Sequence, residues 1–274
     1  MNEKYIQIHF TTGDQSLKDE LIAALSEIAF EGFEETDEGL NAFIKNGDFS
    51  EKTFEEAIYK YNIPFEIKII EQQNWNALWE SSFEPVIVED FAAIRAGFHE
   101  PVKNVQYEII ITPKMSFGTG HHATTWMMIA EMQHINFTGK PVFDFGTGTG
   151  VLAILAEKLG AAYISAIDND EWSIDNAKEN CSVNECTGVD LQLSSQPDTE
   201  KKFEIILANI NKNIILQFMS SLAQQLLPGG TLLLSGLLDE DEDDIKKAAS
   251  FNSLQFIHTA WKEKWICMKY EKEV

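Results

Sequence analysis

The sequence predicts an α/β protein in two parts: a small α+β domain of the ferredoxin-like type, then a Rossmann-like domain with a seven-stranded sheet. Two observations lead to this fold class. The first 70 residues follow the order strand, helix, strand, strand, helix, strand, which is the ferredoxin-like order. From residue 142 onward, apolar runs alternate with helical patterns and end in a hairpin, which is typical of a parallel sheet closed by an antiparallel pair. A chain of 274 residues is long enough for two domains.

The first domain, residues 1–70, consists of short elements. Ser16 is expected to cap a helix that runs to Phe30, and Ser50 is expected to cap a second helix. No constellation of catalytic residues occurs here, so the predicted role of this domain is either folding support or substrate docking. Strands are expected, from the short apolar runs, at 5–10, 32–36, 40–44 and 65–69.

A linker is predicted between the two domains, at residues 71–83. A short helix there carries Trp75 and Trp79 one turn apart on the same face, where tryptophans pack a joint more often than they bind a ligand. The second domain is assigned to residues 84–274. It opens with a run of short strands that extends to Ile111.

The second domain is organised around a glycine-rich turn. An apolar run leads into Asp144, Gly146, Gly148 and Gly150 in the pattern D-x-G-x-G-x-G, followed by apolar residues at helical spacing. The next apolar run ends on Asp168, which completes a βαβ unit of the nucleotide-binding type. Glycine allows the backbone to approach a ligand closely, and an aspartate at the strand end can accept hydrogen bonds from a ribose diol.

The glycine pattern distinguishes between two kinds of nucleotide ligand. Dinucleotide sites have the pattern G-x-G-x-x-G, but Val151 stands where the third glycine would be. A pyrophosphate at a helix N-terminus also disfavours a neighbouring acid. S-adenosylmethionine (SAM) has no phosphate and carries a sulfonium and an ammonium, so the sequence favours SAM over NAD. The predicted cofactor-binding residues in this unit are Asp144, Gly146, Gly148, Gly150 and Asp168.

Another polar residue, Asn209, follows the fourth strand of the parallel sheet. The carboxyl ends of parallel strands meet at one edge of the sheet, and that edge carries the ligand site. An asparagine there can accept a hydrogen bond from an amine and orient its lone pair, so Asn209 is both the predicted catalytic residue and a predicted cofactor contact. The alternative is that Asn209 caps the following helix. No strong base is evident, so desolvation and hydrogen-bond acceptors are expected to favour the neutral amine.

Charge and composition exclude several functions. The net charge of −23, from 21 basic and 44 acidic residues, argues against direct binding of nucleic acid. This charge suits either a basic protein partner or a well-solvated surface. The three cysteines form no CxxC motif, and the adjacent His121 and His122 have no evident third ligand, so no metal site is expected.

The sequence also carries expectations about location and assembly. The first residues lack the pattern of a signal peptide, and no apolar run approaches the length of a membrane span. These observations predict a cytoplasmic protein without membrane contact, and a monomer is expected.

These features together resemble the bacterial methyltransferases of ribosomal protein L11 (PrmA type), a family of class I SAM-dependent enzymes. The resemblance covers nearly the whole chain. It implies the seven-stranded class I methyltransferase domain, contacts to SAM at Thr125, Gly146, Asp168 and Asn209, and a mobile loop around Phe117 that closes over the cofactor. It also implies trimethylation of lysine side chains and of the N-terminal α-amine of L11, a basic protein substrate. The specific part is the F-G-T-G loop at 117–120 with the paired threonines at 124–125, joined to D-F-G-T-G-T-G at 144–150; A-N-I at 208–210 also matches.

The chain departs from the family pattern at two places. His121-His122-Ala123 replaces the usual T-H-P before the paired threonines, and Asn211-Lys212-Asn213 replaces small or apolar residues after A-N-I. The loop geometry and the preference among methylation sites are therefore open.

Three other functions compete with this interpretation. Another SAM-dependent N-methyltransferase could act on a different protein or a small amine; enzymes that act on bases or glutamine have N-P-P-Y after the fourth strand, which is missing here. An NAD-dependent oxidoreductase is disfavoured by Val151. A non-catalytic binding module is disfavoured by the intact glycines.

Overall fold

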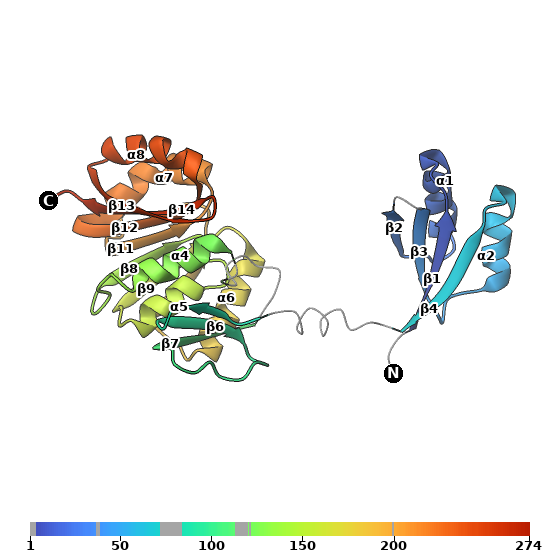
Figure 1. Ribbon diagram of the computed structural model, residues 1–274, viewed down its shortest axis with the longest axis horizontal. Helices are drawn as coiled ribbons and strands as arrows, with labels where there is room; N and C mark the ends of the chain where they lie inside the picture. The colour runs from blue at the N-terminus through green and yellow to red at the C-terminus, as the bar shows by residue number, and fades with distance from the viewer. Residues whose placement is uncertain (1–3, 37–38, 72–83, 113–119, 121, 199) are drawn as a thin grey trace. The chain divides into compact units, whose positions relative to one another are not determined.

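The computed structural model describes residues 4–36, 39–71, 84–112, 120, 122–198 and 200–274. The chain divides into two compact units, Met1–Ser82 and Phe83–Val274, each with its own hydrophobic core (Figure 1). The predicted linker helix falls on residues 72–83 and lies outside the described residues. None of the described helices is long and apolar enough to cross a membrane.

The N-terminal unit is a four-stranded antiparallel sheet, of order β2-β3-β1-β4, whose core contains side chains from two helices. Alternate strand residues such as Ile8 and Leu40 are fully buried against Leu21 and Phe54 from the helices. This period of two is the reason why the apolar–polar alternation predicts strands here. The elements are β1 (Lys4–Thr11), α1 (Gln15–Ser26), β2 (Gly32–Thr36), β3 (Gly39–Lys45), α2 (Glu51–Ile58), a 3₁₀ turn (Tyr59–Tyr61) and β4 (Phe65–Glu71).

The ends of α1 correct the expectation from the sequence. Asp14, and not Ser16, caps the helix, because the Asp14 carboxylate accepts a hydrogen bond from the Ser16 N–H at 3.0 Å. Both residue types cap helices, and the sequence does not distinguish two such residues that lie so close together. The helix also ends before Phe30, because Ala29 adopts a left-handed φ of 69°. The second cap is as predicted, at Ser50.

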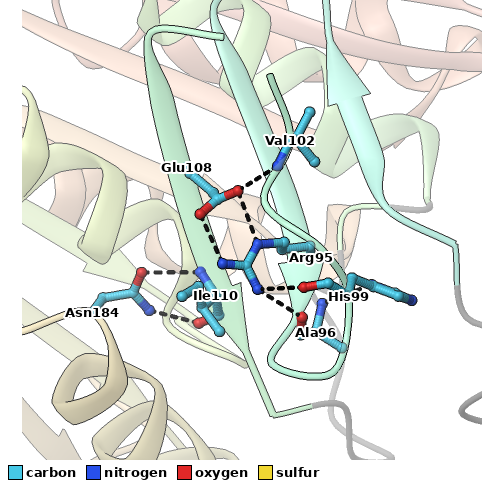
Figure 2. A network of polar contacts seen from close by, with 7 residues as sticks. All are labelled: Arg95, Ala96, His99, Val102, Glu108, Ile110 and Asn184. Carbon is cyan, nitrogen blue, oxygen red and sulfur yellow. Dashed lines mark hydrogen bonds and ion pairs between the residues drawn. The ribbon is translucent and has the colours of Figure 1, made fainter. Parts of the chain in front are cut away.

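The larger unit opens with a three-stranded sheet formed by β5 (Val86–Val88), β6 (Ala92–Ala96) and β7 (Tyr107–Ile111). A largely buried ion pair joins β6 to β7 (Figure 2): Arg95 Nε lies 2.8 Å from Glu108 Oε1, and a terminal nitrogen donates to Oε2 at 2.9 Å. The remaining nitrogen of Arg95 donates to the carbonyl oxygens of Ala96 and His99. The Arg95 guanidinium holds the pKa of the Glu108 carboxyl below its usual range. This network fixes the connection between β6 and β7.

Three asparagines attach this small sheet to the helix α6 (Glu171–Val183) and its C-cap. Asn184 accepts from the Ile110 N–H at 3.0 Å and donates to the Ile110 carbonyl at 2.6 Å, as a neighbouring strand would (Figure 2). Asn180 accepts from the Thr112 N–H at 2.7 Å, and Asn176 donates to the Thr112 carbonyl. The spacing of four residues puts all three on one face of the helix.

The main sheet of this unit has seven strands in the order β10-β9-β8-β11-β12-β14-β13. All neighbours are parallel except β14, which is antiparallel to both β12 and β13. The order reverses at β8, which lies between β9 and β11, so the switch point of the sheet is there. The strands are β8 (Pro141–Phe145), β9 (Tyr163–Asp168), β10 (Val189–Leu193), β11 (Phe203–Asn209), β12 (Leu226–Leu238), β13 (Leu254–Lys262) and β14 (Trp265–Lys272).

Helices cover both faces of this sheet (Figure 1). Val142 and Leu207 pack on the side of α4 and α5, whereas Phe143 and Ala208 pack on the side of α7 and α8. Successive strand residues therefore serve two separate cores, which explains the continuous apolar runs in the sequence. The predicted α/β domain with a mixed seven-stranded sheet is confirmed. Besides α6, its helices are α4 (Ala123–Met132), α5 (Val151–Lys158), α7 (Lys212–Gln225) and α8 (Glu242–Ser250), with a 3₁₀ turn at Asp239–Asp241.

Candidate active site

The glycine-rich turn connects β8 to α5 at the carboxyl edge of the sheet. The N–H groups of Gly146 and Thr147 both donate to the Ile167 carbonyl at 2.9 Å, which holds the turn against β9. Gly146 has a φ of 79°, and a Cβ atom there would collide with a methyl group of Ile210. Glycine is therefore required at this position by conformation and by space, as the D-x-G-x-G-x-G pattern predicts.

Asp168 ends β9 beside this turn. Its Oδ2 accepts from the Gly148 N–H at 2.9 Å, and its Oδ1 accepts from the Asp170 N–H at 3.0 Å. The side chain is only partly buried. Each carboxylate oxygen can accept more than one hydrogen bond, so a ligand with two neighbouring hydroxyl groups can still be bound.

Asp144 lies behind the turn and is not among the described residues that line the cavity. It is fully buried within β8, and its Oδ2 accepts a hydrogen bond of 2.6 Å from the Thr147 hydroxyl. Burial raises the pKa of Asp144 to about 7, although the hydrogen bond from Thr147 acts in the opposite direction. The structure thus separates Asp144 from the other predicted cofactor residues, because the second residue before Gly146 still belongs to the strand.

Asn209 and Thr125 come together although they are distant in sequence. The side-chain nitrogen of Asn209 donates to the Thr125 hydroxyl at 3.1 Å, and Thr125 is fully buried on α4. The Asn209 Oδ1 atom is buried and has no hydrogen-bond partner among the described residues. Buried amide oxygens nearly always have a donor, so this atom is free to receive one from a ligand.

The alternative role of Asn209 as a helix cap is excluded. Asn211 caps α7 instead, because its side chain accepts from the Ile214 N–H at 3.2 Å.

A cavity of about 580 Å³ lies along the carboxyl edge of the sheet, within the size range of small-molecule sites. The strand order divides its lining into two halves. The β9 half lies at the ends of β8, β9 and β10, and includes Gly146, Gly148, Asp168, Ser173, Ser194 and Gln196. The β11 half lies at the ends of β11 and β12 and the start of β14, and includes His122, Asn209, Ile210, Asn211, Gly236 and Trp265.

Residues 9–273 match the family model described as ribosomal protein L11 methyltransferase (PrmA). The chain belongs to this family. Proteins named ribosomal protein L11 methyltransferase include one from Phocaeicola vulgatus, 35% identical over 97% of this chain and 99% of its own length. Another, from Porphyromonas gingivalis, is 37% identical over 92% of this chain and 90% of its own. The resemblance inferred from the motifs is therefore confirmed.

Solved structures agree with the family assignment. The crystal structure of ribosomal protein L11 methylase from Lactobacillus delbrueckii subsp. bulgaricus has a TM-score of 0.65 and 29% identity, covering 70% of this chain and 100% of that chain. A methyltransferase from Pyrococcus furiosus, at 17% identity and a TM-score of 0.52, covers 61% of this chain and 90% of that one and shares the fold.

Several cavity residues of this L11 methyltransferase family member were not found from the sequence. Trp265 begins β14, and because β14 is antiparallel, the start of that strand reaches the same edge as the ends of its neighbours. The Trp265 ring packs edge-on against the His122 ring at 4.5 Å. His122 itself lies beside the start of α4, with Nδ1 2.8 Å from the Thr124 hydroxyl. Ser194 could have been found, since it directly follows β10.

The loop that contains Phe117 falls on residues 113–119 and lies outside the described residues, so its closing role stays a prediction. Its last glycine, Gly120, is described; a Cβ atom there would collide with Ile94. In the described part of the chain, no group of three His, Cys, Asp or Glu residues could hold a metal ion.

Proposed function

We propose that this chain is a SAM-dependent protein N-methyltransferase that methylates lysine side chains and the N-terminal amine of ribosomal protein L11. One observation carries the proposal: Asn209 Oδ1, a buried acceptor without a hydrogen-bond partner in the part of the chain that the structure describes, belongs to a residue that lines the same cavity as the glycine turn and Asp168. A site with a nucleoside-binding half and a lone acceptor beside it is suited to bring an amine to a bound methyl donor. Family membership supports the same reaction.

The residues present fit SAM. The glycine turn leaves room that a side chain would fill, and Asp168 offers carboxylate oxygens for the ribose hydroxyls. We propose Gly146, Gly148, Asp168 and Asn209 as cofactor contacts, with Thr125 acting through its hydrogen bond to Asn209 and Phe117 through the loop. When bound, SAM supplies a methyl group already activated by the sulfonium.

Asp144 and Gly150 take indirect roles in this proposal. Gly150 begins α5 at a φ of 80°, and Asp144 holds Thr147 inside the turn, so both shape the backbone that faces the cofactor.

The work left to the protein is alignment and desolvation of the amine. Positioning alone can contribute several orders of magnitude to such a displacement. Trp265 and Phe218 line the β11 half with largely apolar surface, which disfavours the charged form of an incoming amine. Asn209 Oδ1 accepts an N–H of the neutral amine and thereby directs its lone pair. The amine loses its proton to solvent before transfer, because Asn209 Oδ1 accepts a hydrogen bond from the neutral amine and does not take the proton itself.

We further propose that the N-terminal unit is a ferredoxin-like substrate-recognition domain at residues 1–70, joined through 71–83 to the methyltransferase domain at 84–274. Its strand order β2-β3-β1-β4 with two helices supports the ferredoxin-like assignment. Its acids, among them Glu31, Glu34 and Glu35, suit a basic ribosomal protein.

The same proposal covers partners and place of action. The chain acts as a monomer, in the cytoplasm, and makes no direct contact with nucleic acid, which agrees with its net charge of −23.

The test is to incubate the purified full-length chain with isotopically labelled SAM and purified L11, and to map the label by mass spectrometry. We expect label on lysine side chains and on the N-terminal amine of L11. A second reaction replaces L11 with a whole ribosomal protein mixture. Label on another protein only, with L11 unmodified, would favour the alternative of a different protein substrate, and absence of any label would contradict the proposal.

A further inference from the structure

The stretch Asn211-Lys212-Asn213, where the chain departs from the family pattern, begins at the cavity wall and continues into α7. Asn211 lines the cavity and caps α7, and Lys212 is the first residue of that helix. A lysine in the first turn lies at the positive end of the helix dipole, which is unfavourable by itself. Two carboxylates offset this: Lys212 Nζ lies 3.0 Å from Asp241 Oδ1 and 2.6 Å from Asp244 Oδ2.

Asp241 connects this lysine to the neighbouring strand. Its Oδ2 accepts from the N–H of Leu238, the last residue of β12, at 2.9 Å. The Asp241 side chain is only 13% exposed and that of Lys212 29% exposed. Because water has limited access to Asp241, the attraction is screened less than that of a fully exposed pair. Asp241 therefore bridges the end of β12 and the start of α7.

The same two segments are in direct backbone contact closer to the cavity. The Ile210 N–H donates to the Ser235 carbonyl at 3.1 Å. Gly236 has a φ of 84°, and a Cβ atom there would collide with the Ile210 carbonyl oxygen. Ile210, Asn211 and Gly236 all line the β11 half. The end of β12 and the start of α7 therefore contact each other in two places. Near the cavity they form its wall, and farther from it they are joined by the ion pair of Lys212 and Asp241.

This wall is next to Asn209 and on the opposite side of β8 from Asp168. Asn209 directly precedes Ile210, and the Ile210 side chain also reaches Gly146 of the glycine turn, whereas Asp168 ends β9, across β8 in the sheet order. A shift of the wall would change the space beside Asn209 Oδ1 and leave the Asp168 carboxylate where it is.

We propose that Lys212 is a positioning residue, and that its ion pair with Asp241 sets the wall formed by Ile210, Asn211 and Gly236 against which the acceptor amine is held. This inference rests on the proposed function, since it assigns the β11 half to the amine. Lys212 acts through the wall and makes no contact with the reacting atoms.

The test compares charge removal at two lysines. Lys212→Met removes the charge and keeps the aliphatic stem, and Lys212→Arg keeps the charge. Lys246→Met is the matched control, because Lys246 pairs with Glu242 at 2.9 Å within α8 and neither residue lines the described cavity. For each full-length variant, kcat and KM for L11 are measured together with the dissociation constant for SAM and the melting temperature.

We expect Lys212→Met to lower kcat/KM for L11 by about tenfold, with SAM affinity unchanged, because small misplacements of a reactant are costly. Lys212→Arg should recover most of the activity, and Lys246→Met should behave as the unmodified chain. Combining Lys212→Met with Asp241→Asn should lower activity no further than Lys212→Met alone, since the two residues act as one unit.

Two results would overturn the inference. In one, Lys212→Met has the same L11 kinetics as Lys246→Met. In the other, Lys212→Met loses SAM affinity in parallel with activity, which would make the ion pair a general support of the fold. Failure of the proposed function is recognised separately, because then the unmodified chain itself would transfer no methyl group to L11, and the inference would fall with it.

Discussion

The two halves of the cavity are built in different ways. In the β9 half, Gly146, Gly148 and Asp168 come from one continuous βαβ unit and are held by backbone hydrogen bonds. In the β11 half, His122, Asn209 and Trp265 come from separate elements, and Asn209 is held by Thr125 from α4. The first half depends on backbone conformation within a short stretch, and the second depends on contacts between segments far apart. Under the proposed function, changes in the β9 half should affect cofactor binding and changes in the β11 half should affect methyl transfer.

The largest predicted effect is on stability, when a glycine in each half is replaced by alanine. Both Gly236 and Gly146 have positive φ, but a Cβ at Gly236 meets the backbone oxygen of Ile210, whereas a Cβ at Gly146 meets only a side-chain methyl group of that residue. A side chain can move and a packed backbone cannot. We expect Gly236→Ala to lower the free energy of unfolding by roughly 4 kcal/mol and Gly146→Ala by roughly 2 kcal/mol. Urea denaturation measures the free energy of unfolding of both variants. Equal losses in the two variants would contradict the predicted difference between a backbone and a side-chain collision.

In the β9 half, Asp168→Ala should weaken SAM binding and leave the fold intact. A hydrogen bond to a charged group contributes about 1.5–3 kcal/mol, so loss of the carboxylate should raise the dissociation constant by roughly ten- to a hundredfold. Isothermal titration calorimetry measures this dissociation constant. Asp175→Ala is the matched control, because Asp175 is exposed on α6 and pairs with Lys178. An unchanged affinity in folded Asp168→Ala protein would show that Asp168 is not the ribose ligand.

The raised pKa of the buried Asp144 carboxyl makes the stability of the fold depend on pH. Its pKa is raised by burial from 3.8 to about 7, so between these values the folded protein holds a proton that the unfolded chain releases. The free energy of unfolding contributed by Asp144 is therefore complete below pH 3.8 and falls as the pH rises to about 7.

The variant Asp144→Asn should lack this contribution. Across that window, the stability of the unmodified chain relative to Asp144→Asn should fall by on the order of 4 kcal/mol. Denaturation at a series of pH values in the absence of SAM measures the difference. Curves that stay parallel would mean that Asp144 ionises normally within β8.

The same contrast explains what the sequence could predict. The glycine turn and Asp168 were found because their geometry follows from neighbours in the chain. Asp144 was predicted from its motif as a cofactor-binding residue; it is fully buried inside β8 and binds the Thr147 hydroxyl, and its contact with a cofactor stays a prediction. A spacing motif does not show which side of a strand a residue faces.

The β11 half was predicted only at Asn209, from its place at a strand end; Thr125, which the family resemblance implied, contacts Asn209 from behind the lining. Trp265 carries no local signal, because only the antiparallel pairing of β14 with β12 brings it to the cavity. Asn180 and Asn184 lie at helical spacing, but the small sheet that they satisfy is far away in sequence. Contacts between residues that are far apart in the chain depend on tertiary packing, and a single sequence does not show that packing.

The smallest predicted effect, that of Thr125→Val, tests whether the two halves have separate functions. Thr125→Val keeps the size of the side chain but removes the acceptor for the Asn209 side-chain nitrogen. We expect the rate of methyl transfer to fall about fivefold, as for the loss of one neutral hydrogen bond, with SAM affinity little changed. If SAM affinity falls more than the transfer rate, Thr125 belongs functionally with the β9 half.

The most direct test of the account is the single-turnover rate of methyl transfer from bound SAM to L11 in Asn209→Ala. Asn213→Ala is the control, since Asn213 is exposed on α7 and undergoes the same chemical change. The account predicts that Asn209→Ala loses only about fivefold in SAM affinity, as for one neutral hydrogen bond, but transfers the methyl group about a hundredfold more slowly, whereas Asn213→Ala is unaffected. A transfer rate in Asn209→Ala equal to that of the unmodified chain would contradict the assignment of Asn209 Oδ1 as the acceptor that orients the amine.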